Sequence, residues 1–133
     1  MILIIGIPNS GKTTYSARFD NVIHFDDVWS RDIYHFLADK VKANNDICIE
    51  GVFEKAKNRK LLVEQSKCKN ICIWLDTPID ICLERERMGR KRSEHLVIWA
   101  NEDFEPPTLD EGWDEIIIIR GDNEQRINRK TKN

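Results

Sequence analysis

Short, continuous apolar runs recur along the chain and are separated by longer segments of mixed polarity. The runs lie at residues 1–5, 22–25, 47–49, 71–75 and 116–119. Consecutive apolar residues over so short a length are typical of strands that are covered on both faces of a sheet. The pattern therefore predicts five buried strands.

The segments between these runs carry helical patterns. We predict helices over residues 12–19, 28–42, 55–66, 78–88 and 93–101. Before the fourth helix, Thr77 followed by Pro78 is typical of an N-cap and a proline at the first helical position. Strands that alternate with helices imply right-handed crossovers and a parallel sheet. The predicted fold class is therefore α/β, with three layers around a five-stranded parallel sheet.

Composition narrows the class of protein. A chain of 133 residues with 41% hydrophobic residues is expected to form one domain with its own core. Its formal net charge of −2 excludes a strongly basic global field, so a nucleic-acid site would have to be a local patch. No apolar stretch reaches the roughly 18 residues of a membrane span, and residues 1–5 lack the features of a signal peptide. The predicted location is cytoplasmic.

The cysteines agree with that location. Cys48, Cys68, Cys72 and Cys82 form no CxxC pair, and three of them lie inside apolar runs. A reduced cysteine in such a run behaves as a small hydrophobe. We expect buried, reduced thiols rather than disulfides or a zinc site.

The clearest chemical signal directly follows the first predicted strand. Residues 6–13 read Gly-Ile-Pro-Asn-Ser-Gly-Lys-Thr and precede a predicted helix, which is the context of a P-loop. Gly6 and Gly11 allow backbone N–H groups to wrap around phosphate oxygens, Lys12 can reach the β- and γ-phosphates, and the Thr13 hydroxyl can ligate Mg²⁺. We therefore predict a P-loop NTPase fold that binds ATP and Mg²⁺. The predicted nucleotide-binding residues are Gly6, Pro8, Asn9, Ser10, Gly11, Lys12, Thr13 and Thr14.

Carboxylates stand at the ends of the next predicted strands. In open α/β sheets ligands lie at the carboxyl ends of strands, and a kinase needs a group that deprotonates the acceptor hydroxyl. Asp26 is the predicted base, and Asp27 is the predicted N-cap of the following helix. Glu50 is expected to hold a magnesium-bound water or the acceptor, with a solvated strand-end acid as the alternative. For Asp76 we favour a turn or cap role, and for His24 that of a strand residue.

A charged run further along has the composition of a lid. It reads Arg85-Glu86-Arg87-Met88-Gly89-Arg90-Lys91-Arg92, and the alternative is a solvated charged turn. An arginine lowered over the γ-phosphate would stabilise the charge that phosphoryl transfer spreads over its oxygens. Gly89 allows a bend between two helices. We predict a lid at about residues 85–95, within a kinase domain of residues 1–122, followed by a polar, basic tail at 123–133.

Together these residues resemble the 5′-hydroxyl polynucleotide kinases, the kinase module of phage and animal end-healing enzymes in nucleic acid repair. The resemblance runs from about residue 2 to 119. The P-loop and lid are shared by many small kinases. The distinguishing part is residues 104–113, Phe-Glu-Pro-Pro-Thr-Leu-Asp-Glu-Gly-Trp, which are similar to the segment before the last strand in animal-type polynucleotide kinases. The same stretch appears in some related P-loop kinases of unknown substrate.

The resemblance implies roles for individual residues. The implied catalytic residues are Asp26, Lys12, Arg90 and Arg85, and the implied metal-site residues are Thr13 and Glu50. Arg87 competes for the lid role because the spacing differs slightly from the familiar one. Glu50 stands where the family more often has aspartate. In one departure, Trp29 stands where the phage enzymes have an arginine that holds the substrate. In another, no phosphatase motif is present.

Three functions are open from the sequence. The leading hypothesis is transfer of the γ-phosphate of ATP to a 5′-hydroxyl end of DNA or RNA. Basic residues at 55–60 and 90–92, Arg59 and Lys91 among them, would contact phosphates, and Trp29 or Trp99 would stack on an end base. The alternative is a small-molecule kinase for a nucleoside, nucleotide or sugar, which the lack of net positive charge favours. A nucleotide-dependent switch is the third, and it would not need a base at Asp26.

Overall fold

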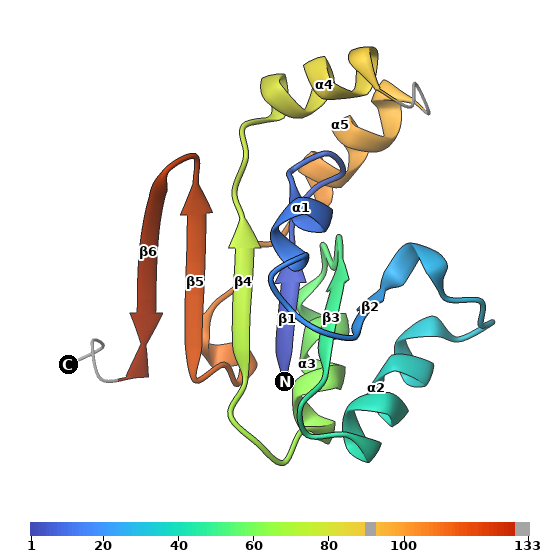
Figure 1. The fold of residues 1–133 in the computed structure, drawn as a ribbon, viewed down its shortest axis with the longest axis vertical. Coiled ribbons are helices and arrows are strands. Elements are labelled where there is room, and N and C mark those ends of the chain that lie inside the picture. Colours follow the sequence, from blue (N-terminus) through green and yellow to red (C-terminus); the bar gives the residue numbers. More distant parts are fainter. Residues whose placement is uncertain (90–92, 130–133) are drawn as a thin grey trace.

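A single six-stranded sheet forms the centre of the molecule (Figure 1). The computed structural model describes residues 1–89 and 93–129. The strands lie in the order β2-β3-β1-β4-β5-β6, and the first five are parallel. Their bounds are β1 Ile2–Ile5, β2 Val22–His24, β3 Cys48–Gly51, β4 Ile71–Leu75, β5 Glu115–Arg120 and β6 Asn123–Asn128. The predicted parallel α/β fold is confirmed.

Helices follow the strands in alternation. Their bounds are α1 Lys12–Ser16, α2 Ile33–Ala43, α3 Ala56–Gln65, α4 Ile79–Met88 and α5 Glu94–Asp103, with short 3₁₀ turns η1 at Phe25–Asp27 and η2 at Leu109–Glu111. In Figure 1, α4 and α5 lie beyond the carboxyl ends of the central strands, at the same end of the sheet as the loop that joins β1 to α1. The helices expected to form a lid therefore stand at the end where ligands of such sheets bind.

Both faces of the sheet are buried, as continuous apolar strands require. Leu3 and Ile5 pack on one face in a cluster with residues of α2 and α3, such as Leu37 and Leu62. Ile4, between them, points to the opposite face and packs in the cluster that Tyr15 of α1 covers. Since successive side chains of a strand alternate between faces, only an apolar residue at every position buries both.

The last strand was not predicted. β6 pairs antiparallel with β5, and Arg120 faces Asn123 across a turn formed by Gly121 and Asp122. Gly121 has a φ of 60°, which glycine adopts readily. β6 lies at the edge of the sheet and is mostly exposed, so backbone pairing holds it while its side chains stay polar. The polar composition that predicted a tail from residue 123 does not distinguish a tail from such an edge strand.

Two predicted helix caps are wrong. The helix expected from residue 28 begins at Ile33, and the side chain of Asp32 accepts a hydrogen bond from the His35 N–H at 3.3 Å. Asp27 lies in η1 and does not cap this helix. Thr77 is not a cap either: Pro78 takes the N-cap position of α4, and the Thr77 hydroxyl donates to the Ser10 carbonyl at 2.8 Å. The Thr77 hydroxyl therefore bonds to a residue distant in sequence instead of capping α4.

The segment 104–113 is anchored by a buried ion pair. Arg59, fully buried, donates from Nε and Nη2 to the two carboxylate oxygens of Glu111 at 2.8 and 2.9 Å. The indole N–H of buried Trp113 donates to the same carboxylate at 3.1 Å. The prediction that Arg59 contacts nucleic-acid phosphates is therefore wrong, because its guanidinium is enclosed and paired with Glu111.

Three of the four cysteine thiols are buried, as expected, and one is exposed. Cys48, Cys72 and Cys82 are buried and Cys68 is exposed; all four are free. Burial raises the pKa of Cys48 to about 11, and it raises the pKa of Cys72 further. Within the described ranges, none of the helices has both the length and the apolar character to cross a membrane.

Candidate active site

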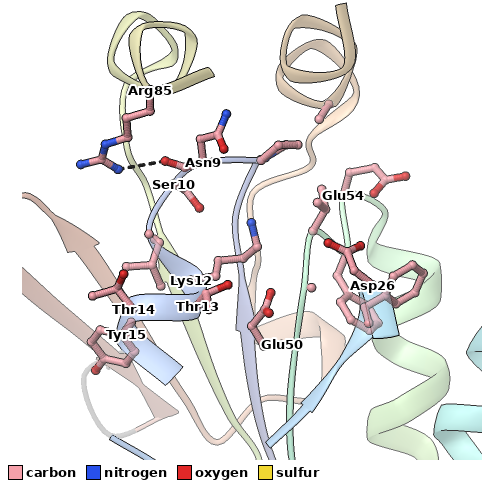
Figure 2. Close-up of a pocket in the computed structure, with 18 of the residues that line it drawn as sticks. Asn9, Ser10, Lys12, Thr13, Thr14, Tyr15, Asp26, Glu50, Glu54 and Arg85 are labelled. Atoms are coloured by element: carbon pink, nitrogen blue, oxygen red, sulfur yellow. Dashed lines mark hydrogen bonds between the residues drawn. The ribbon is translucent and has the colours of Figure 1, made fainter. Parts of the chain in front are cut away.

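A large open cavity lies at the carboxyl ends of the strands. Its volume is about 1010 Å³, and it is lined by the loop from Pro8, by α1, η1 and the end of β3, and by residues of α4, α5 and the turn at Gly121. Figure 2 shows the loop 6–13 crossing the centre of the cavity, with Asp26, Glu50 and Glu54 on one side. All predicted nucleotide-binding residues except Gly6 line this cavity.

The loop has the backbone conformation that a wrapped turn needs. Gly6, Asn9 and Gly11 have φ values of 158°, 68° and 100°. Glycine reaches such angles without strain, and asparagine is the side-chain residue that tolerates the left-handed region best. A Cβ at Gly6 would also lie 2.4 Å from the Ser10 hydroxyl, so the loop closes tightly over this position. The motif glycines are thus required by geometry.

Lys12 is the first residue of α1, and its side chain folds back against the loop. Its side chain is buried, and Nζ donates to the carbonyl of Ile7 at 2.9 Å, which holds the ammonium group beside the loop's backbone. Thr13 and Thr14 are exposed and face the cavity. The Ser10 hydroxyl is buried without a hydrogen-bond partner among the described residues. A cationic group and exposed hydroxyls beside a wrapped backbone suit a polyphosphate.

α4 holds the loop through contacts that the sequence did not reveal. The Asn9 amide donates to the Glu86 carboxylate at 3.0 Å and to the Cys82 carbonyl at 3.3 Å. Glu86 is only 5% exposed, and the neighbouring Arg85 donates to the Asn9 carbonyl at 2.9 Å. Glu86 stands in a charged run that resembles a solvated surface, so no periodic signal marked it as buried.

The expected lid arginines have different positions. Arg85 lines the cavity, and Figure 2 shows its hydrogen bond to the Asn9 backbone. Arg87 instead pairs with Glu94 of α5 at 2.5 Å, which ties the two helices together. Arg90 and the rest of the basic run at 90–92 lie outside the described residues. Of the predicted lid arginines within the described residues, Arg85 is therefore the one that lines the cavity.

The predicted base lies across the cavity from Arg85. Asp26 is exposed in η1 and lines the cavity, while its neighbour Phe25 packs edge-on against Phe53, with ring centroids 5.5 Å apart. A Cβ at Gly51 would lie 2.8 Å from the Cβ of Phe25, so glycine at the end of β3 lets the two segments approach. This aromatic contact fixes the turn that carries Asp26.

Glu50 is held from behind by a histidine. Its side chain is 9% exposed, and Oε1 lies 2.8 Å from Nδ1 of His24 on the adjacent strand β2. Figure 2 shows the Glu50 carboxyl group pointing into the cavity, below Lys12. His24 is therefore a strand residue, as predicted, and it also orients Glu50. Glu54, which the sequence analysis did not single out, lines the same wall.

Two other predicted residues lie elsewhere. Asp76 does not cap α4; its carboxylate pairs with Nε of Arg120 at 2.6 Å. Trp29 is 99% exposed and does not line the cavity, whereas Trp99 of α5 is 58% exposed and does. Only Trp99 is thus placed to contact a ligand in this cavity.

A bound Mg²⁺ suits the residues present. Mg²⁺ is usually held by one or two side chains together with substrate phosphates and water, rather than by a full protein cage. Among the described residues there is no cluster of three or more potential metal-ligating His, Cys, Asp or Glu side chains. Thr13 and Glu50, which both line the cavity near Lys12, supply the oxygen donors that such a shared site needs.

Solved structures share this architecture. A gluconokinase from Sinorhizobium meliloti 1021 is similar to 92% of this chain and 82% of its own, with a TM-score of 0.73 and 14% identity. A sugar kinase from Janibacter sp. HTCC2649 is similar over 90% of this chain and 83% of its own, with a TM-score of 0.73 and 18% identity. The chain has the fold of the P-loop kinases. No protein-family model and no curated protein matches the sequence.

Proposed function

We propose that this protein is an ATP-dependent kinase that transfers the γ-phosphate to a hydroxyl group of a small molecule. The observation that carries the proposal is one shared cavity. It is lined by a P-loop with Lys12 at one side and by the exposed carboxylate of Asp26 at the other. A phosphate donor and a base on opposite sides of one cavity are the minimum that phosphoryl transfer to an alcohol needs.

The donor half would hold ATP by its phosphates. The backbone N–H groups of the P-loop and the ammonium group of Lys12 would receive the β- and γ-phosphates, and Arg85 would approach from α4. Thr13 and Glu50 would hold Mg²⁺, directly or through water. When bound, Mg²⁺ neutralises charge on the β- and γ-phosphate oxygens.

The acceptor half would supply the proton acceptor. The acceptor's hydroxyl oxygen attacks the γ-phosphorus, a new O–P bond forms, and the bond from the γ-phosphorus to the bridging oxygen breaks to release ADP. Asp26 accepts the hydroxyl proton during this step. Lys12 and Arg85 stabilise the charge that spreads over the transferred group, because they are positive and stay on the donor side.

A small acceptor is better supported than a polynucleotide. The structural neighbours include a gluconokinase and a sugar kinase. Arg59 is buried and paired with Glu111, which removes one of the expected phosphate contacts, and the neighbouring Lys57 and Lys60 do not line the cavity. The basic residues 90–92 lie outside the described structure. Transfer to a 5′-hydroxyl end therefore stays a prediction from the sequence.

Transfer of labelled γ-phosphate from ATP to an acceptor panel tests the proposal. The panel contains sugars, sugar acids, nucleosides and a 5′-hydroxyl oligonucleotide. We expect transfer to at least one small acceptor, lost in Asp26→Asn. If only the oligonucleotide is labelled, and its KM rises steeply with salt as phosphate contacts demand, the small-molecule proposal is wrong. If a protein that binds ATP labels nothing, the kinase proposal itself is wrong.

A further inference from the structure

The charged residues that line the cavity are divided between its two halves. The described cationic lining residues are Lys12, Arg18 and Arg85. Lys12 and Arg85 contact the P-loop backbone, and the Arg18 guanidinium lies 4.2 Å from the ring centroid of Tyr15, whose ring packs on the face formed with β4 and β5. The described positive charges that line the cavity therefore gather at the P-loop and beside Tyr15 of α1.

In the other half, every charged residue among the described lining residues is a carboxylate. They are Asp26, Glu50, Glu54 and Asp103. Asp103 belongs with Glu54 because the next segment connects them: the Glu105 N–H donates to the Glu54 carbonyl at 2.8 Å. Asp26, Glu50 and Glu54 lie at or just beyond the carboxyl ends of β2 and β3, on the opposite side of β1 from β5. Since the base Asp26 is here, this half is the acceptor side.

The number of carboxylates exceeds what catalysis needs. Asp26 serves as the base, and Glu50 serves the metal and is held by His24. Glu54 and Asp103 have neither role, and no described salt bridge neutralises them. An acceptor with a negative charge, such as a sugar acid or a nucleotide, would meet repulsion from these groups. An acceptor with hydroxyl and ammonium donors would find acceptors for each.

An exposed indole on α5, one helical turn before Asp103, also lines the cavity. Trp99 is 58% exposed, stacks on His95 with ring centroids 5.7 Å apart, and lines the cavity together with Leu96. Aromatic and apolar side chains together with a few polar groups are the usual lining of small-molecule pockets. A tryptophan face attracts cations, and it also packs against the C–H face of a sugar ring. An aromatic face in the same cavity as carboxylates that no described residue neutralises therefore selects for a protonated amine on a polyhydroxy ring.

We propose that the acceptor is an amino sugar or a related amine-bearing polyol, with its ammonium group held by Glu54 and Asp103 and its ring covered by Trp99. The proposal rests on the proposed kinase function, and it specifies the charge of the substrate that this kinase takes. It excludes the acid form of a sugar as the preferred acceptor.

Three pyranoses that differ in charge test the preference directly. Glucosamine, glucose and glucuronate carry positive, neutral and negative charge at pH 7, and a multi-ring aminoglycoside extends the series. We expect kcat/KM to fall in the order amine, neutral, acid, by at least about tenfold from the amine to the acid, as charge-assisted hydrogen bonds predict. The KM for the amine should rise with salt, whereas that for glucose should stay flat.

Variants test whether Glu54, Asp103 and Trp99 cause the preference for an amine-bearing acceptor. Glu54→Gln and Asp103→Asn keep the side-chain shape, and each should raise the KM for the amine about three- to tenfold, a larger factor than for glucose. Glu102→Gln is the matched control, since Glu102 is an exposed neighbour on α5 that does not line the cavity. Trp99→Ala should weaken binding of both sugars. Circular dichroism establishes that each variant is folded.

The outcomes separate this inference from the kinase proposal. If glucuronate is used as well as glucosamine, or if Glu54→Gln and Asp103→Asn change all acceptors equally, the amine preference is wrong and the kinase function stands. If ATP binds in a Lys12-dependent way but no acceptor is phosphorylated, the kinase function fails, and the inference fails with it.

Discussion

The side-chain amide of Asn9 donates a 3.0 Å hydrogen bond to the buried carboxylate of Glu86. This contact joins the P-loop to α4, and Arg85 on the same helix donates to the carbonyl of Asn9. The loop residue with a positive φ of 68° is therefore held through both its side chain and its backbone. Since this conformation is uncommon for a residue with a side chain, the contacts with α4 stabilise the shape of the phosphate cradle.

Replacing Glu86 should weaken nucleotide binding. Glu86→Ala leaves the Asn9 amide without its carboxylate partner, and we expect the KM for ATP to rise about tenfold, the usual scale for an unpaired buried polar group. Glu86→Gln, which still offers an oxygen acceptor, should be milder. Glu84→Ala, at an exposed position of the same helix, is the control. An unchanged KM in Glu86→Ala would show that α4 does not shape the loop.

Replacing Lys12 should abolish phosphoryl transfer. Lys12→Ala removes the cation beside the phosphates, and we expect a loss of kcat/KM of at least about a hundredfold, as for other groups that stabilise transition-state charge. The protein should stay folded by circular dichroism, because the Lys12 side chain makes a backbone contact rather than a core contact. Lys57→Ala, on the exposed surface of α3, should have no effect. Full turnover in a folded Lys12→Ala protein would reject the P-loop assignment.

Asp26 and Asp27 can be separated by one matched pair of variants. Asp26→Asn keeps the shape and removes the base, so kcat should fall by about a hundred- to ten-thousandfold while ATP binding, measured by calorimetry, is retained. Asp27 is also exposed in η1 but does not line the cavity, and Asp27→Asn should be nearly neutral. The reverse ranking would move the base to Asp27.

The Arg59–Glu111 pair should be essential to stability. Arg59→Ala leaves the Glu111 carboxylate buried without its cation, and breaking such a pair costs about 3–5 kcal/mol of unfolding free energy. Urea denaturation measures this loss, and Lys60→Ala, one residue along on the exposed face of α3, should change stability by less than about 0.5 kcal/mol. If Arg59→Ala is as stable as the wild type, the pair does not anchor the segment 104–113.

The free energy of unfolding should fall at alkaline pH because of the buried thiols. The pKa of Cys48 is raised from 9.0 to about 11, chiefly by burial, and burial also raises the pKa of Cys72. A thiol whose pKa is higher in the folded state contributes stability fully below its unfolded pKa and loses it as pH rises through the folded value. The melting temperature should therefore decline between pH 8.5 and 10.5, because the unfolded chain releases thiol protons that the folded protein still holds.

The cysteine variants identify the source of that decline. Cys72→Ala should flatten the pH dependence while lowering stability at pH 7, since it also removes a buried side chain. Cys68→Ser, at the exposed thiol, should change neither. A pH profile that Cys48→Ala and Cys72→Ala both leave unchanged would assign the decline to other groups.

The sequence predicted most of the elements because their signals are local. A continuous apolar run marked each parallel strand, and the glycine spacing of residues 6–13 marked the P-loop. Boundaries were less certain where two residues offered the same local interaction. Asp27 and Asp32 can both cap a helix, and the chain uses Asp32 because Phe25 and Phe53 hold the earlier turn against the sheet.

Edge position explains the strand that the sequence missed. β6 is paired on one side only and most of its side chains are exposed, so its polar residues carry no core pattern. The turn of Gly121 and Asp122 was its local signal. For the candidate site, the residues of the cradle and the acids at the strand ends were predictable from the sequence, but Arg59 was wrongly assigned to a basic surface patch, because it is buried and paired with Glu111.

The sequence by itself determined how the five parallel strands alternate with helices along the chain. It also determined the cradle geometry of Gly6 and Gly11 and the presence of acids at the carboxyl ends of β2 and β3. These features follow from backbone conformation and from the alternation of side chains over a few residues. Only the tertiary structure decided that Glu111 neutralises Arg59, that Glu86 holds Asn9, and that His24 orients Glu50. Those partners lie 52, 77 and 26 residues apart, and charged side chains far apart in sequence look alike until folding brings one to the other's side and removes the water between them.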